Sequence, residues 1–299
     1  MEEEYLDEFE EDRLTKRIVD LISKNYSIEQ IQELLPKLES YMIISKLLRH
    51  SETDEQIINK IKEYYDNFRI DSDKCLIIAD SHLGRIEDDR NEYDEENIEL
   101  LNGNDYAIYE AYHYASKKNI KNIIHLGDLI EGNSDKTQRK MLPVEYQISH
   151  LIEVFPEKED IQTYLLYGNH DLNAIECDGV EPDFYKKCKN TKLIGAEIGY
   201  IHIWDSFVKL SHISKDTRYR IEKVKNINLP YDFELSWHTH VYKYIEETRT
   251  IKVPSLTKDS KTRNVGFIEL ENAGEELIYR YIGDECKLMD EKVLKKTLT

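Results

Sequence analysis

Residues 75–82 read Cys-Leu-Ile-Ile-Ala-Asp-Ser-His, an apolar run that ends in a carboxylate and an imidazole two positions apart. The run Cys75–Ala79 has the length and composition of a buried β-strand. Side chains two positions apart on an extended chain project to the same side, so Asp80 and His82 are expected to converge on one point. Because α/β proteins place their ligands at the carboxyl ends of strands, this stretch predicts a functional site on an α/β fold.

Further polar clusters follow apolar β-type runs in the same way. They are Gly127-Asp128, Gly168-Asn169-His170-Asp171, His212 and His238-Thr239-His240. Taken singly, such residues are more often caps or surface groups than ligands, but the whole series in this order would rarely arise by chance. Imidazole together with oxygen donors and no thiolate is typical of Mn, Fe or Zn sites. The set is too large for one tetrahedral ion and suits two ions that share a bridging ligand.

The apolar spacing changes near residue 70. Before this point apolar residues recur at helical spacing and predict four short helices, so residues 1–70 are expected to form an all-α module. One interpretation is a helix-turn-helix-like module that places residues 37–49 against DNA. We favour a role in oligomerisation or protein docking, because the acidic stretch 2–12 would repel DNA.

After residue 70, short apolar runs alternate with helical segments. The expected strands are Cys75–Ala79, Asn122–Leu126, Gln162–Tyr167, Lys192–Ile194, Tyr200–Trp204, Val208–Ser211, Phe233–Ser236, Tyr242–Glu246 and Gly266–Leu270. Helices at about 104–118 and 143–154 separate the first three strands, which predicts a parallel βαβαβ start followed mostly by hairpins. We therefore expect an α/β domain over residues 71–285, with a sheet-on-sheet core flanked by helices, and a frayed tail over residues 286–299.

The composition excludes several classes of protein. The 299 residues are 40% hydrophobic, enough for a core, and carry a net charge of −19. The longest apolar runs are far shorter than the ~20 residues of a membrane span, and the acidic start is unlike a signal peptide. A cytoplasmic protein without a membrane partner is expected, and its four cysteines, which lack CxxC spacing, indicate reduced thiols. The acidity disfavours broad, charge-driven coating of nucleic acid. A nucleic-acid partner could still bind through a local basic patch or through bound divalent cations.

The order D-x-H, G-D, G-N-H-D, H and H-x-H resembles the motifs of the calcineurin-like metallophosphoesterase family, over roughly residues 73–272. The resemblance implies the family's β-sandwich and a dinuclear metal site. The ligands it implies are Asp80, His82 and His240 for one ion, Asn169, His212 and His238 for the other, and Asp128 as the bridge between them. It also implies that His170 touches the phosphate and that Asp171 orients His170. The chain departs from the family at Trp237, where a glycine is usual.

Two adjacent cations would lower the pKa of a bridging water to give hydroxide near neutrality and would stabilise the charge that builds during in-line attack. His170 would protonate the leaving oxygen. We therefore expect a metal-dependent phosphoric ester hydrolase, either a phosphodiesterase or a phosphatase, with nucleotide or nucleic-acid phosphodiesters as the favoured substrates. The expected cofactors are two divalent transition metal ions, with Mn favoured over Fe or Zn.

Substrate contacts are harder to place from the sequence. The candidates are Asn169, His170, Arg218 and Arg220, and the alternative for the two arginines is a pair of solvated loop charges. The alternative function is a catalytically weak scaffold, or a DNA-binding regulatory protein, that retains the metal site.

Overall fold

A computed structural model describes residues 8–49, 54–84, 103–133, 143–155, 158, 160–212, 229–257 and 264–296. The chain divides into two compact units, of which the N-terminal one ends at Phe68 and the larger one begins at Arg69. The described residues 229–230 group with the N-terminal unit. Among the helices of the described residues, none is long and apolar enough to cross a membrane.

The N-terminal unit is built from four helices, as the apolar spacing predicts. They are α1 (Glu8–Ser23), α2 (Ile28–Leu34), α3 (Ser40–Leu48) and α4 (Glu55–Tyr65). Each of them buries an apolar face, and Ile18, Ile31 and Ile61 are completely buried. The backbone N–H of Gln30 donates to the Ser27 hydroxyl at 3.2 Å, and the N–H of Ser27 donates to the Gln30 side chain at 2.9 Å. This reciprocal capping fixes the start of α2.

The larger unit is a β-structure with one continuous order of hydrogen-bonded strands. Along that order the strands are β13 (Lys287–Lys295), β12 (Glu276–Gly283), β11 (Phe267–Ala273), β2 (Lys74–Ile78), β3 (Asn122–His125), β4 (Gln162–Tyr167), β5 (Thr191–Ala196), β6 (Ile198–Ile203), β7 (Ser206–His212), β8 (Phe233–Trp237), β10 (Thr250–Lys252) and β9 (Lys243–Ile245). The two-residue strand β1 (Arg69–Ile70) pairs with β6 outside this order.

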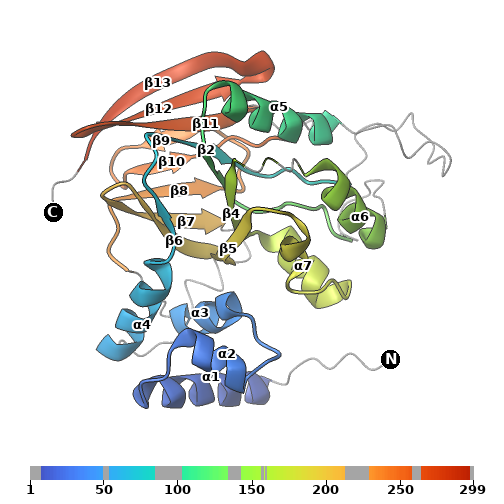
Figure 1. The fold of residues 1–299 in the computed structure, drawn as a ribbon, viewed down its shortest axis with the longest axis vertical. Helices are drawn as coiled ribbons and strands as arrows, with labels where there is room; N and C mark the ends of the chain where they lie inside the picture. The colour runs from blue at the N-terminus through green and yellow to red at the C-terminus, as the bar shows by residue number, and fades with distance from the viewer. Residues whose placement is uncertain are drawn as a thin grey trace. The chain divides into compact units, whose positions relative to one another are not determined.

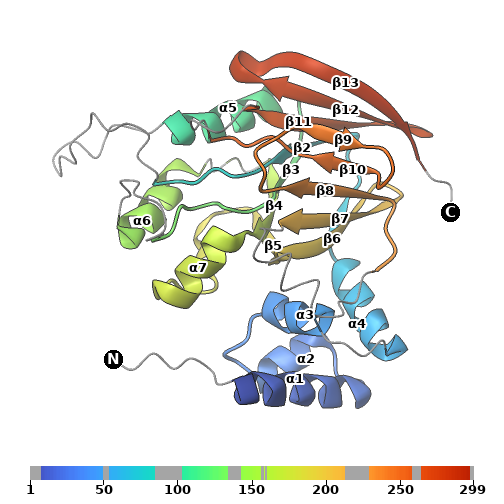
Figure 2. The same cartoon turned by 180° about the vertical axis from the view of Figure 1, so that it is seen from behind.

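This strand order doubles back into two layers, as expected for a sheet-on-sheet core (Figure 1). The layers are joined between β5 and β6 by a single residue pair, Ala196 with Ile198. At the far end, β9 packs against β12, where the rings of Tyr244 and Tyr279 lie 5.8 Å apart. Helices α5 (Gly103–Lys117), α6 (Val144–Val154) and α7 (Asn169–Cys177) lie along one flank of the strands (Figures 1 and 2).

Strand direction determines where a site can form. Strands β2, β3 and β4 run parallel, which confirms the expected βαβαβ start, so their carboxyl ends lie at one edge. Beyond residue 191 the sequence predicts mostly hairpins, and β5–β6, β6–β7 and β11–β12 are antiparallel. However, β7–β8 and β8–β10 are parallel. The parallel pairing of β7 with β8 brings their carboxyl ends together as well.

The frayed tail predicted for residues 286–299 is wrong over most of its length. Residues Lys287–Lys295 form β13, which pairs antiparallel with β12. The sequence pattern misleads because this strand is exposed almost throughout and therefore carries charged residues at most positions. Its strand conformation is imposed by backbone pairing with β12 and needs no apolar run of its own.

Candidate metal centre

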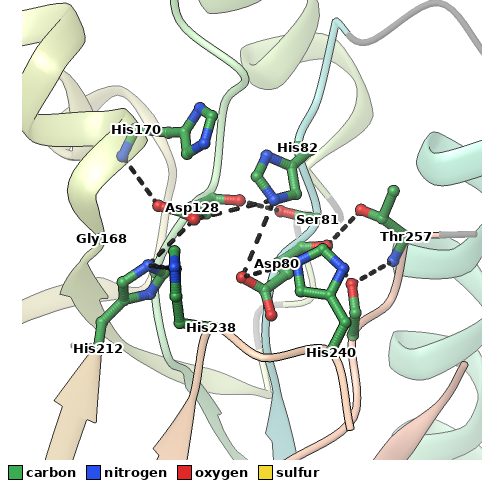
Figure 3. Close-up of polar contacts among 12 residues, drawn as sticks. Asp80, Ser81, His82, Asp128, Gly168, His170, His212, His238, His240 and Thr257 are labelled. Carbon is green, nitrogen blue, oxygen red and sulfur yellow. Dashed lines mark hydrogen bonds and ion pairs between the residues drawn. The ribbon is translucent and has the colours of Figure 1, made fainter. Parts of the chain in front are cut away.

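The polar clusters predicted from the sequence meet at one edge of the larger unit. Each cluster follows a strand, and the strands concerned are β2, β3, β4, β7 and β8. Figure 3 shows the carboxylates of Asp80 and Asp128 and the imidazoles of His82, His212, His238 and His240 pointing toward one another. Three groups of ligand atoms, each within 4.8 Å of one another, could hold an ion: Asp80 with His82 and His240; His82 with Asp128 and His170; and Asp128 with His212 and His238.

One half of the centre is formed by Asp80, His82 and His240. The Nε2 atoms of His82 and His240 each lie 3.9 Å from the same carboxylate oxygen of Asp80. These separations are wider than a hydrogen bond and leave room for an ion between the three side chains. We call this set the Asp80 half.

The other half is arranged around the Nε2 atom of His212. That atom lies 2.7 Å from Oδ1 of Asn169, 3.2 Å from Nδ1 of His238 and 3.1 Å from Oδ2 of Asp128. The same Asp128 oxygen lies 3.8 Å from Nε2 of His82. Asp128 is therefore within reach of both halves, and we call the set around His212 the His212 half.

The backbone at these positions is unusual. Asp80, His82, Asp128, His238 and His240 all have a positive φ, between 44° and 93°, which residues with a side chain rarely adopt. Such conformations persist only when the surroundings impose them, and they concentrate at functional sites. The strain is evidence that this edge of the protein is built to aim particular side chains.

Two contacts hold the loops of this edge in place. The carbonyl of Asp80 accepts hydrogen bonds from the hydroxyls of Thr257 and Ser255, both buried in the loop that follows β10. Gly127, with a φ of +95°, lies so close to Gly168 that a Cβ would come within 2.5 Å of the Gly168 backbone nitrogen. The Gly-Asp and Gly-Asn-His-Asp loops can therefore approach each other only with glycine at residue 127.

Electrostatics favour a cation at the centre. Burial raises the pKa of Asp80 well above its ordinary value, and the Asp128 carboxylate raises it further. Burial also opposes ionisation of Asp128, but the imidazoles of His212 and His170 hold its pKa well below the usual range. For His212, burial opposes protonation, yet the Asp128 carboxylate raises its pKa to about 9. The Asp128 carboxylate thus favours positive charge at the position of His212.

The residues present fit a pair of divalent ions. Both carboxylate oxygens of Asp80 are buried, and they accept no hydrogen bond from any residue in the described part of the chain. A buried carboxylate without a donor is costly unless a cation is its partner. Imidazole nitrogens and carboxylate and amide oxygens are donors that suit Mn, Fe or Zn.

His170 and Asp171 lie in the first turn of helix α7 but have different surroundings. Nδ1 of His170 lies 2.6 Å from the backbone carbonyl of Glu131. Burial alone would lower the pKa of His170, but the carboxylates of Asp128 and Glu131 raise it above its ordinary value. The expectation that Asp171 orients His170 differs from what is seen, because the buried Asp171 carboxylate accepts backbone N–H groups of Leu129, Ile130 and Gly168 instead. Asp171 has this geometry because its side chain reaches back to cap its own helix.

Sequence reasoning missed the residues that support the candidate ligands. Glu131, three positions after Asp128, has a carboxylate oxygen 2.8 Å from Nδ1 of His82. The sequence did contain a signal for Glu131, because this charged residue directly follows the apolar pair Leu129-Ile130 in a loop that is buried. Trp237, the departure from the family pattern, is buried with its ring 4.5 Å from that of His212. The substrate-binding candidates Arg218 and Arg220 lie outside the described residues.

Comparison with known proteins gives a family match. The family model described as calcineurin-like phosphoesterase matches residues 74–262. Among solved structures, the phosphoesterase Yfce from E. coli is 11% identical over 73% of this chain and 98% of its own, with a TM-score of 0.44. A dimetal phosphatase from Danio rerio is 9% identical over 75% and 99%, with a TM-score of 0.42, and Vps29 from Chaetomium thermophilum is 11% identical over 75% and 100%, with a TM-score of 0.36. No curated protein matches the sequence.

Proposed function

This chain belongs to the calcineurin-like phosphoesterase family, and we propose that it is a two-metal phosphodiesterase whose substrates are nucleotide or nucleic-acid phosphodiesters. The family implies phosphoester hydrolysis with divalent metal ions. The observation that carries the proposal is the position of Asp128, one carboxylate oxygen of which lies 3.8 Å from His82 and 3.1 Å from His212. A carboxylate between two sets of donors is the arrangement that a pair of neighbouring ions requires.

The proposed ligands follow the two halves of the centre. Asp80, His82 and His240 would hold one ion, Asn169, His212 and His238 the other, and Asp128 would contact both. We propose Mn as the metal, with Fe and Zn as ions that the same donors accept. When bound, two such ions supply an activated water and positive charge that stabilises the phosphoryl oxygens.

His170 is the proposed proton donor. Its Nδ1 contacts the Glu131 carbonyl at 2.6 Å, so the ring is held and Nε2 is left for the substrate. Burial lowers the pKa of His170, but the Asp128 and Glu131 carboxylates raise it above its ordinary value, which favours the protonated ring that a general acid needs. An alkoxide that leaves a phosphate ester needs that proton, in monoesters and diesters alike.

The remaining parts of the proposal concern partners and location. We propose that the four N-terminal helices mediate oligomerisation or protein docking, because this module contributes none of the motif residues of the metal centre. We also propose a cytoplasmic location, because the four cysteines are few and lack CxxC spacing.

The experiment is a substrate panel with Mn²⁺ added to metal-stripped protein. We expect hydrolysis of bis-p-nitrophenyl phosphate and of a dinucleotide or a short oligonucleotide, with little turnover of a nucleoside monophosphate. Asp128→Asn should abolish turnover, whereas Asp160→Asn, which changes an exposed aspartate paired with Lys121, should not. Turnover of monoesters alone would overturn the substrate class. Metal binding without turnover of any ester would favour the scaffold function instead.

A further inference from the structure

Glu131 is a buried carboxylate directed at one of the candidate ligands. Its side chain is 1% exposed, and one carboxylate oxygen lies 2.8 Å from Nδ1 of His82. The other ring nitrogen of His82, Nε2, faces Asp80 and Asp128 at 3.9 Å and 3.8 Å. Glu131 is therefore on the far side of the imidazole from the proposed ion.

The backbone holds this pair in place. The loops that carry the two residues run side by side through three hydrogen bonds, from the N–H of His82 to the carbonyl of Asp128, from Leu83 to Leu129 and from Glu131 to Leu83, all between 2.9 and 3.1 Å. The same three hydrogen bonds that join the Asp80-Ser81-His82 loop to the Gly127-Asp128 loop therefore fix Glu131 opposite His82. Rotation of either side chain away from the other would leave a buried charge without its partner.

The chemistry of the contact has a definite consequence. The contact is an ion pair and does not have the geometry of a hydrogen bond. The negative charge beside Nδ1 nevertheless favours the tautomer with hydrogen on that nitrogen, which leaves the lone pair of Nε2 directed toward Asp80 and Asp128. The negative charge of Glu131 also makes Nε2 of His82 a stronger electron-pair donor to a metal ion. Partners of this kind typically change metal affinity about 10- to 100-fold when they are removed.

Among the described residues, no carboxylate takes the equivalent position beside Nδ1 of His212. There, Nδ1 of His212 faces the neutral backbone carbonyl of Leu126 at 3.3 Å. Apart from Asp128, which reaches both halves, the oxygen donor of the His212 half is the neutral amide of Asn169, whereas that of the Asp80 half is the Asp80 carboxylate. The two halves therefore differ in buried negative charge, with both Asp80 and Glu131 on one side.

We propose that Glu131 is a positioning residue that fixes the tautomer of His82 and makes the Asp80 half the tighter of two metal sites, so that this half fills first. The inference rests on the proposed two-metal function. Glu131 acts through His82 and contacts no substrate. Its backbone carbonyl, which contacts His170, is unchanged by substitution of the side chain.

The test is calorimetric titration of the metal-stripped full-length protein with Mn²⁺. Wild type should bind two ions with unequal affinities. Glu131→Gln, which keeps the shape but loses the charge, should weaken the tighter step about 10-fold or more and leave the weaker step within about twofold. Glu131→Ala should weaken the tighter step further. The matched control is Glu269→Gln, another buried glutamate, which lies on β11 and contacts Tyr114 and Arg280.

A second measurement does not depend on metal. The ¹⁵N signals of the histidine rings report which nitrogen carries hydrogen, and His82→Asn identifies the signals of His82. Wild type should show His82 with hydrogen on Nδ1, and Glu131→Ala should show a mixture of tautomers. A role of Glu131 limited to protein stability would leave the tautomer unchanged.

The outcomes are distinguishable. Equal weakening of both steps, weakening of the looser step alone, or an equal effect of Glu269→Gln would overturn the inference. If wild type binds fewer than two ions, the two-metal function fails, and the tautomer still decides whether Glu131 positions His82. Should Glu131→Gln not fold, Glu131→Asp keeps the charge at a longer distance and should weaken the tighter step by a smaller factor.

Discussion

Replacing His170 with Ala should remove a proton donor from the site and leave the proposed ligands in place. The imidazole contacts the Glu131 carbonyl through Nδ1, and its ring lies edge-on to that of His82 at 4.7 Å. The backbone N–H of residue 170 donates to Oδ1 of Asp128 at 2.9 Å, and that hydrogen bond survives the substitution. The position of Asp128 should therefore be preserved.

The magnitude follows from the role. A positioned general acid typically contributes about 10²- to 10⁴-fold, which corresponds to about 3–5 kcal/mol of transition-state stabilisation. The full loss is expected only for an ester whose leaving group needs a proton. A nitrophenolate leaves without one, so the rate for an activated nitrophenyl ester should fall much less than the rate for an alkyl ester.

The assay compares kcat for two phosphodiesters, one with a nitrophenyl and one with an alkyl leaving group, in wild type and in His170→Ala. Metal content is measured on the same samples. His113→Ala provides the control, because His113 is an exposed histidine on α5 outside the centre.

Two results would refute the reasoning. Equal rate losses for both esters would mean that His170 binds the phosphate and does not act as the acid. Loss of metal from His170→Ala would make His170 a ligand, a role that its grouping with His82 and Asp128 also allows.

Further predictions test the centre, the modules and the buried network. Elemental analysis after remetallation should find two ions per chain, and Asp128→Asn should reduce this number because Asp128 reaches both halves. A chain that begins at Arg69 should unfold cooperatively by circular dichroism and still hydrolyse a chromogenic diester, and an unfolded product would place the helices in the core. Burial lowers the pKa of His125 to about 3, so below about pH 6.5 only the unfolded chain takes up its proton. Between pH 7 and pH 5, wild type should therefore lose about 2 kcal/mol more stability in urea titrations than His125→Gln, and parallel curves would contradict this. Asp171→Asn should cost about 1–3 kcal/mol, because an amide cannot accept from all three backbone N–H groups, and an unchanged urea midpoint would exclude that role.

The strands of the site could be predicted because their signal is local. The run from Tyr164 to Tyr167 is apolar and is followed by a glycine, and the structure has β4 at the predicted bounds Gln162–Tyr167. Strands β10, β12 and β13 were missed because they carry mixed or charged residues and depend on pairing with distant neighbours. In the N-terminal unit, the N–H of Leu38 donates to the carbonyl of Leu35 and closes a turn, so α3 begins at Ser40, within the predicted segment 37–49 and three residues after its start.

From the sequence alone, the types of donor, their order and their place at strand ends were determined, because each motif is adjacent in the chain to the strand that presents it. Tertiary structure decided which groups face one another. Glu131 meets His82 and Thr257 meets Asp80 only because separate loops are brought together by strand pairing and by the order of strands in the sheet. Contacts of this kind depend on register and packing across the whole sheet, and no local spacing records them.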